Sequence, residues 1–302
     1  MANSSSITLL NSLEFARKYV YNRQLSLGDF KEPLITASNL VKQVILSPPF
    51  RWRFNRSITG FYTTPSVQDY LLGNWSASTL LGASFFVIDS NGNSQKVTTA
   101  GTTGAALPAW NATLGGTTTD NTVTWTNQGP IPNASSTYTF GWIENCTVKD
   151  PGTSKWMELS PKIDLALDSS TARPQNIAAE LDPLNGSQLF RLMPVPDKVY
   201  PVAITLQQKA GLFTSLNQTW SPLPDEYSYI YQWGLLAEIF LFADDARATW
   251  ASQKFVSHLL GANQGLSDTE RNVFLANWQA ITGNPVENQI QLQQGNQARG
   301  GY

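Results

Sequence analysis

The stretch GTTTDNTVTWTNQG, residues 116–129, is rich in Thr, Asn and Gly and carries a single charged residue, Asp120. Within it Val123 and Trp125 alternate with threonines, which is the period-two pattern of a strand that buries one face. Upstream, DSNGNS at 89–94 contains Asn-Gly, a dipeptide that favours a tight hairpin turn. The apolar FFVI before this turn and QKVTTA after it are the expected hairpin strands. Together these patterns predict a small all-β module.

The composition around this module differs from that of its flanks. Between Thr98 and Thr126, eleven of 29 residues are Thr and Asp120 is the only charge. We therefore predict an inserted all-β module with the boundaries 75–132, inside a body formed by residues 1–74 and 133–284.

The last stretch of the chain is set apart by its composition. Residues 285–302 are rich in Gln, Asn and Gly and lack a repeating apolar face. Such a segment cannot bury enough apolar surface to fold by itself, so we predict a flexible C-terminal tail.

Both ends of the body are expected to be helical. Apolar residues recur at helical spacing over 8–22 and 36–46, and again from the end of SPLPDEY at 221–227 to about Ala280. The segment YSYIYQWGLLAEIFLFA is apolar on almost every side, so we expect it to be buried by its own domain or by neighbouring copies. Ser267 and Glu270 have capping-box spacing and predict the start of the last helix.

Strand patterns fill the body between these helices. In FRWRFNR, residues 50–56, Phe50, Trp52 and Phe54 alternate with polar residues, which predicts a strand with one aromatic and one basic face. Further alternating segments are YTFGWIENCTV, KWMELSPKIDLAL, QLFRLMPVP and YPVAITLQQK. The predicted fold class is α+β, in which helical bundle elements at both ends flank an antiparallel β-sheet or sandwich that carries the small all-β module as an insertion.

Charge and composition narrow the classes of function. The chain has 302 residues, 14% of them charged, 10 Trp and a net charge of −2. No run of Lys or Arg stands out, which argues against broad electrostatic binding to nucleic acid. Because like charges keep protein surfaces apart in water, a low content of charged residues with many aromatic residues indicates surface that contacts partner proteins. A β-rich protein with many Ser and Thr residues would have the same composition, so this alternative stays open.

Neither a signal-peptide pattern nor an apolar stretch of about 18 uncharged residues is found in the sequence. We therefore expect a chain that is made and kept in a cytoplasm and does not associate with a membrane.

The sequence offers little for catalysis. His258 is the only histidine and Cys146 the only cysteine, which excludes multi-His metal sites and cysteine clusters. No phosphate-binding loop, dinucleotide-binding motif or nucleophile elbow occurs. The acidic pairs Asp225-Glu226 and Asp244-Asp245 lie at expected helix boundaries. We predict that the protein is not an enzyme and has no catalytic, cofactor-binding or metal site.

Candidate contact residues come from pattern alone. Arg51 and Arg53 lie on the basic face of the expected strand, and Arg56 is its last residue. All three are either solvated side chains or partners in inter-subunit ion pairs. In the module, Trp110 and Trp125 are either a carbohydrate-contact surface or its core, and a module this small favours the core interpretation. The other predicted interface residues lie in the apolar helix and the tail: Trp233, Phe240, Gln289, Gln291, Gln293, Arg299 and Tyr302.

The module resembles a small β-module that recurs inside structural proteins of tailed bacteriophages. The residues that carry this resemblance are Asn91-Gly92, Ala100-Gly101, Gly104, Pro108-x-Trp110, Gly115, Asp120 and Val123-Thr-Trp125. The rest of the chain is similar to phage head-to-tail adaptors through three segments, ILSPPFRWRFNR, RLMPVPDKVYPVAITLQQKA and WSPLPDEYSYIYQWGLLAEIFLFADDAR.

The resemblance implies a virion neck protein that forms a homo-oligomeric ring, commonly twelvefold, below the portal protein. Such a ring joins the capsid to tail or nozzle proteins and lets DNA pass through its channel without sequence-specific binding. Two other roles stay open: a tail-tube terminator or other tail component, and a receptor- or glycan-binding tail protein.

Overall fold

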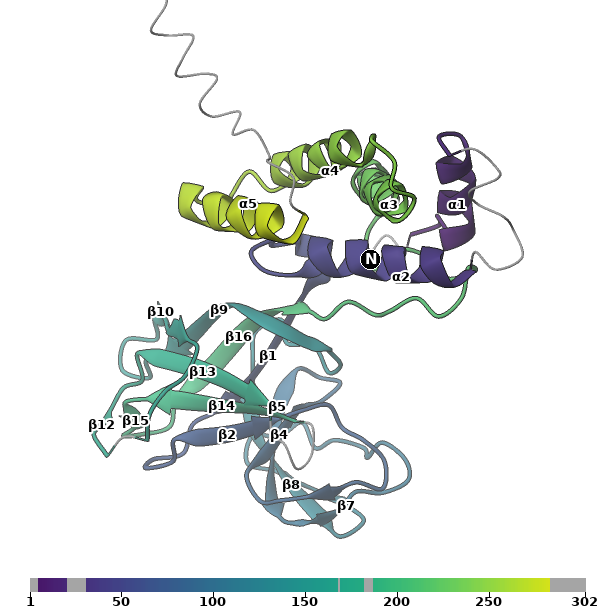
Figure 1. The fold of residues 1–302 in the computed structure, drawn as a ribbon. Coiled ribbons are helices and arrows are strands. Elements are labelled where there is room, and N and C mark those ends of the chain that lie inside the picture. The colour runs from purple at the N-terminus through teal and green to yellow at the C-terminus, as the bar shows by residue number, and fades with distance from the viewer. Residues whose placement is uncertain (1–4, 21–30, 168, 182–186, 283–302) are drawn as a thin grey trace, which may run out of the picture. The chain divides into compact units, whose positions relative to one another are not determined.

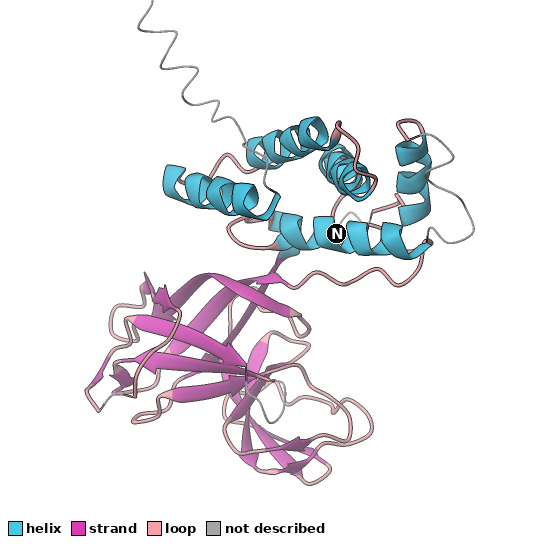
Figure 2. Cartoon of the chain, viewed as in Figure 1, coloured by secondary structure: helices cyan, strands magenta, loops and turns pink. Residues whose placement is uncertain are grey.

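A computed structural model describes residues 5–20, 31–167, 169–181 and 187–282. The chain divides into a helical unit, Met1–Phe54 with Ala210–Tyr302, and a β unit, Asn55–Lys209. Figures 1 and 2 show that the described α-helices belong to the first unit and the described strands to the second. The predicted α+β class, with helices from both chain ends around a sheet-rich middle, is confirmed.

The helical unit contains five helices within the described part of the chain. They are α1 (Leu9–Arg17), α2 (Lys31–Leu46), α3 (Ser228–Phe242), α4 (Ala248–Ala262) and α5 (Asp268–Thr282), with 3-10 turns at Arg53–Asn55 and Asp225–Tyr227. Thr8 caps α1 by accepting from the backbone N–H of Asn11, and the helix ends at Arg17, earlier than the predicted range of 8–22. The predicted capping box of α5 is confirmed, because Ser267 N donates to Glu270 Oε2 at 2.9 Å and Glu270 N to Ser267 Oγ at 3.3 Å.

Helix α3 is the centre of the helical unit, and it contacts α1, α2 and α4 (Figure 1). Eight of its 15 residues are buried and are spread around its circumference. Gly234 allows the close approach of α2, since a Cβ at this position would lie 2.6 Å from Val41 Cγ1. The prediction that this apolar helix is buried is confirmed, and its own unit supplies most of the cover.

The two chain segments that make up the helical unit are joined near the start of α3. The Asp225 carboxylate accepts from Ser5 Oγ at 2.8 Å and from the backbone N–H groups of Ser6 and Ile7 at 3.1 and 3.2 Å. Hydrogen bonds from Ser6, Ser5 and these amides lower the pKa of Asp225 to about 2. One acid of the predicted helix-boundary pair thus anchors the N-terminal segment.

Residues 50–56 do not form the predicted strand. Phe50 and Trp52 are buried in the helical core, and Trp52 Nε1 donates to the carbonyl of Ile45 at 2.6 Å. A 3-10 turn follows at Arg53–Asn55, and the strand begins only at Arg56. The alternation misled because the aromatic side chains anchor a loop on the helices rather than line one face of a sheet.

The β unit contains strands of between two and ten residues. They are β1 (Arg56–Tyr62), β2 (Asp69–Leu72), β3 (Leu80–Leu81), β4 (Phe85–Ile88), β5 (Asn93–Thr99), β6 (Gly101–Thr102), β7 (Thr117–Asp120), β8 (Val123–Pro130), β9 (Phe140–Lys149), β10 (Trp156–Glu158), β11 (Ser160–Lys162), β12 (Thr171–Ala172), β13 (Asn176–Leu181), β14 (Gln188–Met193), β15 (Val195–Pro196) and β16 (Pro201–Gln208).

Two sheets share one core. The smaller has the order β1-β16-β9-β10 and the larger β11-β13-β14-β2-β4-β5-β8-β7. Phe61 and Ile204 of the smaller sheet and Tyr70 and Phe190 of the larger lie in the same buried cluster, as expected for a sandwich. The larger sheet is mixed rather than antiparallel, because β2 pairs with β4 and β11 with β13 in parallel.

The predicted module is part of this larger sheet. Strand β2 pairs directly with β4, and β5, β8 and β7 follow in order, so the structure places no unit boundary at 75 or 132. The hairpin at 89–94 is confirmed, with Gly92 at φ +79°. The end of the sheet retains a small core of its own: Leu81, Phe85, Val87, Val97, Val123 and Trp125.

A buried carboxylate holds this small core together. Asp120, 4% exposed, accepts from Trp75 Nε1 at 2.8 Å, from Trp125 Nε1 at 3.2 Å and from the backbone N–H of Gly104 at 2.7 Å. Three N–H donors from separate segments thus compensate the desolvation of the charge.

We expect Asp120→Asn to destabilise the β unit by about 2–3 kcal/mol, because the new amide places N–H groups against donors that need acceptors. Urea unfolding followed by tryptophan fluorescence measures the change. Asp164→Asn, at an exposed position, is the matched control. An Asp120→Asn chain as stable as its parent would contradict this account of the core.

Lys42 of α2 is 4% exposed and lies 4.5 Å from the centre of the Phe213 ring. Burial lowers the pKa of Lys42 from 10.5 to about 8. Between these two pH values the unfolded chain binds more protons than the folded chain, so the stability of the folded state rises with pH across this window.

Lys42→Met removes this titration, and we expect a gain in stability at neutral pH on the order of 2 kcal/mol. The difference from the parent is expected to shrink as the pH rises from 8 towards 10.5. Thermal unfolding over this pH range tests both points, with the exposed Lys254→Met as control. A difference in stability between Lys42→Met and the parent that does not change with pH would contradict a lowered pKa for Lys42.

Candidate interaction surfaces

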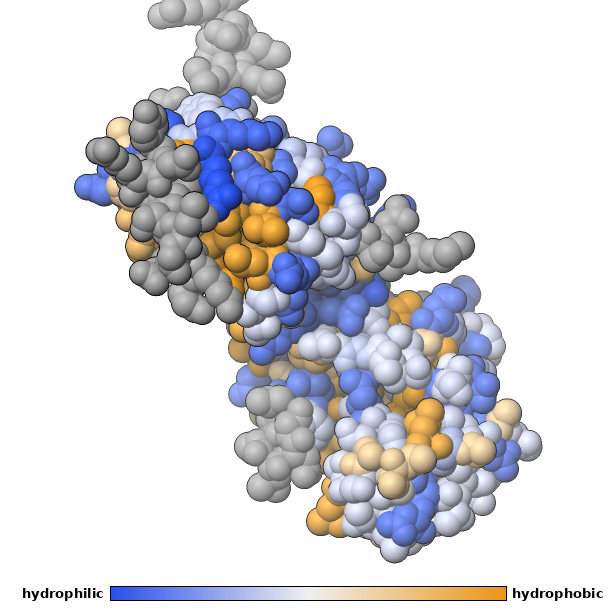
Figure 3. Space-filling model, turned by 90° about the vertical axis from the view of Figure 1, so that its right-hand side faces the viewer, coloured by the Kyte–Doolittle hydropathy of each residue, from blue (hydrophilic) through white to orange (hydrophobic). Residues whose placement is uncertain are grey.

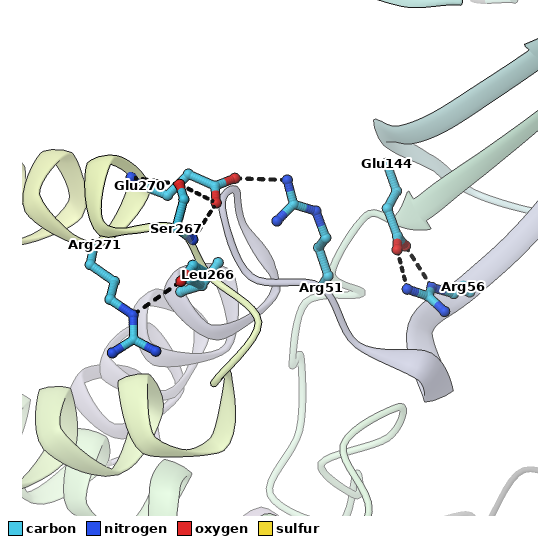
Figure 4. A network of polar contacts seen from close by, with 7 residues as sticks. All are labelled: Arg51, Arg56, Glu144, Leu266, Ser267, Glu270 and Arg271. Atoms are coloured by element: carbon cyan, nitrogen blue, oxygen red, sulfur yellow. Dashed lines mark hydrogen bonds and ion pairs between the residues drawn. The ribbon is translucent and has the colours of Figure 1, made fainter. Parts of the chain in front are cut away.

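Arg51 forms an ion pair within the helical unit. Its Nη2 lies 2.7 Å from Glu270 Oε1, and Glu270 also belongs to the capping box of α5 (Figure 4). The hydrogen bond from Arg51, together with those from Ser267, lowers the pKa of Glu270 to about 2. This predicted contact residue therefore ties the loop after α2 to the start of α5.

Arg56 forms a second ion pair, within the β unit. Its Nε donates to Glu144 Oε2 at 2.7 Å, and Gln207 Nε2 donates to the same oxygen at 2.7 Å. The Glu144 side chain is only 7% exposed, whereas that of Arg56 is 40% exposed. Arg56, Gln207 and Trp142 are register partners on the neighbouring strands β1, β16 and β9. Arg56 thus balances a buried charge of its own chain, while Arg53 lies exposed in its 3-10 turn.

Of the two interface residues predicted in the apolar helix, only one reaches the surface. Phe240 is fully buried, so it is a core residue and not available to a neighbouring copy. Trp233 is half-buried between Tyr19 and Trp250, with ring centroids at 6.1 and 4.9 Å. Gln289, Gln291, Gln293, Arg299 and Tyr302 lie outside the described residues.

The turn between α3 and α4 exposes large apolar side chains that sequence analysis did not single out. In this segment, residues 241–250 and here called the α3–α4 corner, Leu241 is 52%, Phe242 70% and Trp250 44% exposed. Figure 3 shows that apolar side chains gather on one face of the helical unit. The available signal was Leu-Phe at the very end of an apolar helix, separated by one alanine from two acids.

The α3–α4 corner is held in a fixed conformation. Arg247 pairs with Asp245 at 2.6 Å, donates to the carbonyl of Tyr19 at 2.8 Å and lies 4.5 Å from the centre of the Phe240 ring. Asp244 adopts the left-handed region at φ +50°, which is uncommon for a residue other than glycine and requires support from its surroundings. The exposed apolar residues are therefore presented by a preorganised turn.

The two module tryptophans have different surroundings. Trp125 is fully buried and bonded to Asp120, so it belongs to the core and does not contact a ligand. Trp110 is half-buried and packs against Trp125 with ring centroids 5.5 Å apart at 80°. It belongs to a loop at 105–116 in which Leu107 is 56% and Leu114 71% exposed.

Reactive side chains are few in the described part of the chain. Cys146 is buried, and burial raises the pKa of its thiol. His258 packs edge-on to Tyr229 at 5.2 Å, and burial lowers its pKa. Within the described ranges, no group of three or more His, Cys, Asp or Glu is placed to hold a metal ion.

A bilayer-spanning segment is likewise not found in the described residues, because no helix there combines sufficient length with apolar character. The chain matches no protein-family model, and no curated protein matches it either.

If Arg56 stabilises its own chain, Arg56→Ala destabilises the β unit by about 2 kcal/mol, because Glu144 stays buried with a single amide donor. A double-mutant cycle with Glu144→Ala, measured by urea unfolding, gives the coupling free energy between the two side chains. Arg53→Ala is the matched control. A change in oligomeric state without loss of stability would instead assign Arg56 to an inter-subunit ion pair.

Proposed function

We propose that this protein is a structural virion protein of a tailed bacteriophage, a head-to-tail adaptor that forms a ring below the portal. In this role it joins the capsid to the tail and maintains a channel for DNA. The observation that carries the proposal is the α3–α4 corner, where a fixed turn exposes Leu241, Phe242 and Trp250.

Exposed apolar residues on a rigid turn suit a protein whose work is contact with other proteins. Helix α3 obtains most of its cover from its own unit, and its last two residues, Leu241 and Phe242, are the most exposed of its large apolar side chains. A covering partner lifts the free-energy penalty of leaving Leu241 and Phe242 in water.

Weak charge supports the same proposal. With a net charge of −2 and 14% charged residues, copies of this chain repel each other little. The side chains of Arg51 and Arg56 are engaged by acids of their own chain, which leaves contacts between copies to apolar and neutral polar groups. Closed rings are built from such repeated contacts.

The position in the virion and the partners of this protein are proposed from the resemblance of its sequence to phage neck proteins. These partners are the portal, tail or nozzle proteins, and the DNA that passes through the channel. A tail-tube terminator or another tail component shares the need for ring contacts and differs in the protein it binds. Affinity for the portal separates these roles.

The test is the molar mass by light scattering, alone and after mixing with the portal of the same virus. We expect a high-order ring that forms on the portal, and we expect Phe242→Asp to weaken this assembly at least tenfold, which corresponds to about 1.4 kcal/mol. Val273→Asp, at a position 55% exposed on α5, is the control.

A stable assembly that ignores the portal overturns the adaptor proposal. A ring that forms equally well with Phe242→Asp leaves the adaptor role standing but removes the α3–α4 corner as the contact. Circular dichroism of both variants establishes that they remain folded.

A further inference from the structure

Two acids border the exposed apolar side chains at the end of α3. Glu238 precedes Leu241 and Phe242 by three and four positions, so helical spacing places its side chain beside both on one face of the helix. Asp244 follows Phe242 by two positions and is exposed. Within the described part of the chain, no side-chain hydrogen bond or ion pair engages either carboxylate.

The environment of Glu238 disfavours its charge. The residue is half-buried, and burial raises the pKa of its carboxyl. The last turn of α3 contains no basic residue, so the negative end of the helix dipole is not offset there. The carboxylate oxygens still reach the surface. A cation from outside the chain can therefore approach Glu238 and compensate its charge.

The one arginine of this region does not balance its acids. Arg247 pairs with Asp245 at 2.6 Å and also donates to the carbonyl of Tyr19. Residues 238–247 contain three acids and one arginine, a net charge of −2, which equals the net charge of the whole chain. The exposed apolar side chains of the α3–α4 corner are therefore set in a locally acidic surface.

This combination of charge and apolar surface selects among partners. Burial of Leu241 and Phe242 favours any apolar surface. A Lys or Arg side chain next to that surface gives the acids a counter-charge, whereas an acidic side chain is repelled. A different protein supplies such cations more readily than a second copy, because four arginines of this chain are paired with its own acids: Arg51, Arg56, Arg191 and Arg247.

We propose that Glu238 and Asp244, together with Leu241 and Phe242, bind a basic apolar segment of a partner protein, in which Lys or Arg side chains flank apolar ones. Burial of the apolar side chains supplies most of the affinity, and the two carboxylates determine which partner binds. The inference rests on the proposed function in one respect, because it takes the α3–α4 corner as a protein-contact surface.

The test is an NMR titration of the isotope-labelled full chain with the peptide acetyl-Lys-Leu-Phe-Lys-amide, followed through the backbone amide signals of residues 238–250. Peptides with Gln or Glu in place of both Lys residues are the comparisons. We expect the Lys peptide to bind about fivefold more tightly than the Gln peptide, which corresponds to roughly 1 kcal/mol, and the Glu peptide to bind most weakly. Added salt is expected to reduce this preference.

Variants assign the preference to the two acids. Glu238→Gln and Asp244→Asn are each expected to reduce the preference for the Lys peptide, and the double variant to abolish it. Asn adopts the left-handed region more readily than most residues, so Asp244→Asn preserves the turn at φ +50°. Glu14→Gln, at an exposed acid of α1, is the matched control and keeps the preference.

The stability of the free chain gives an independent readout. Glu238→Gln removes a half-buried charge that has no partner, so we expect its thermal midpoint at neutral pH to rise by about 2 °C or more. Glu14→Gln is expected to leave the midpoint unchanged. A lower midpoint in Glu238→Gln would mean that the carboxylate is compensated within its own chain, which overturns the proposal.

Equal affinity for the three peptides, or no binding of any of them, also overturns the proposal. Self-association of the chain that Glu238→Gln weakens, measured by light scattering, assigns the corner to a second copy instead. Lack of assembly on the portal with the peptide preference intact overturns the adaptor proposal alone, so the two proposals fail separately.

Discussion

The β unit depends on the satisfaction of one buried charge. Asp120 receives two indole N–H groups and one backbone N–H, from Trp75, Trp125 and Gly104, and no neutral side chain of its size accepts from all three. This explains why a small core is built around two tryptophans. The same carboxylate bonds Gly104 directly before the loop that carries Trp110, so core packing and the conformation of this loop have one origin.

The helical unit follows a different constraint, the burial of a helix that has no polar face. Residues from both chain ends must surround α3, and Asp225 secures this arrangement by holding Ser5, Ser6 and Ile7 at the start of the helix. Gly234 lets α2 approach closely. This cover is incomplete at the C-terminal end of the helix, where Leu241 and Phe242 are exposed.

Sequence periodicity predicted the fold class, the hairpin at 89–94, the strand around Trp125 and the capping box of α5, because each is set by residues close in the chain. It did not predict that β2 pairs with β4, a pairing that makes the module continuous with the sheet of the body. FRWRFNR was misassigned because alternation reports which side chains share a direction and not what they contact. The ion pair of Arg56 with Glu144 joins residues 88 positions apart, beyond the reach of a local pattern.

Several carboxylates accept hydrogen bonds or form ion pairs within the chain itself. Glu144, Glu270, Asp120 and Asp225 are each met by donors of the same chain. Two of the three arginines predicted at an interface, Arg51 and Arg56, pair with these acids. Within the helical unit, the surface that remains for partners is the apolar α3–α4 corner. Since Arg51 and Arg56 are engaged by acids of their own chain, contact with a protein neighbour at this corner rests on the burial of apolar side chains.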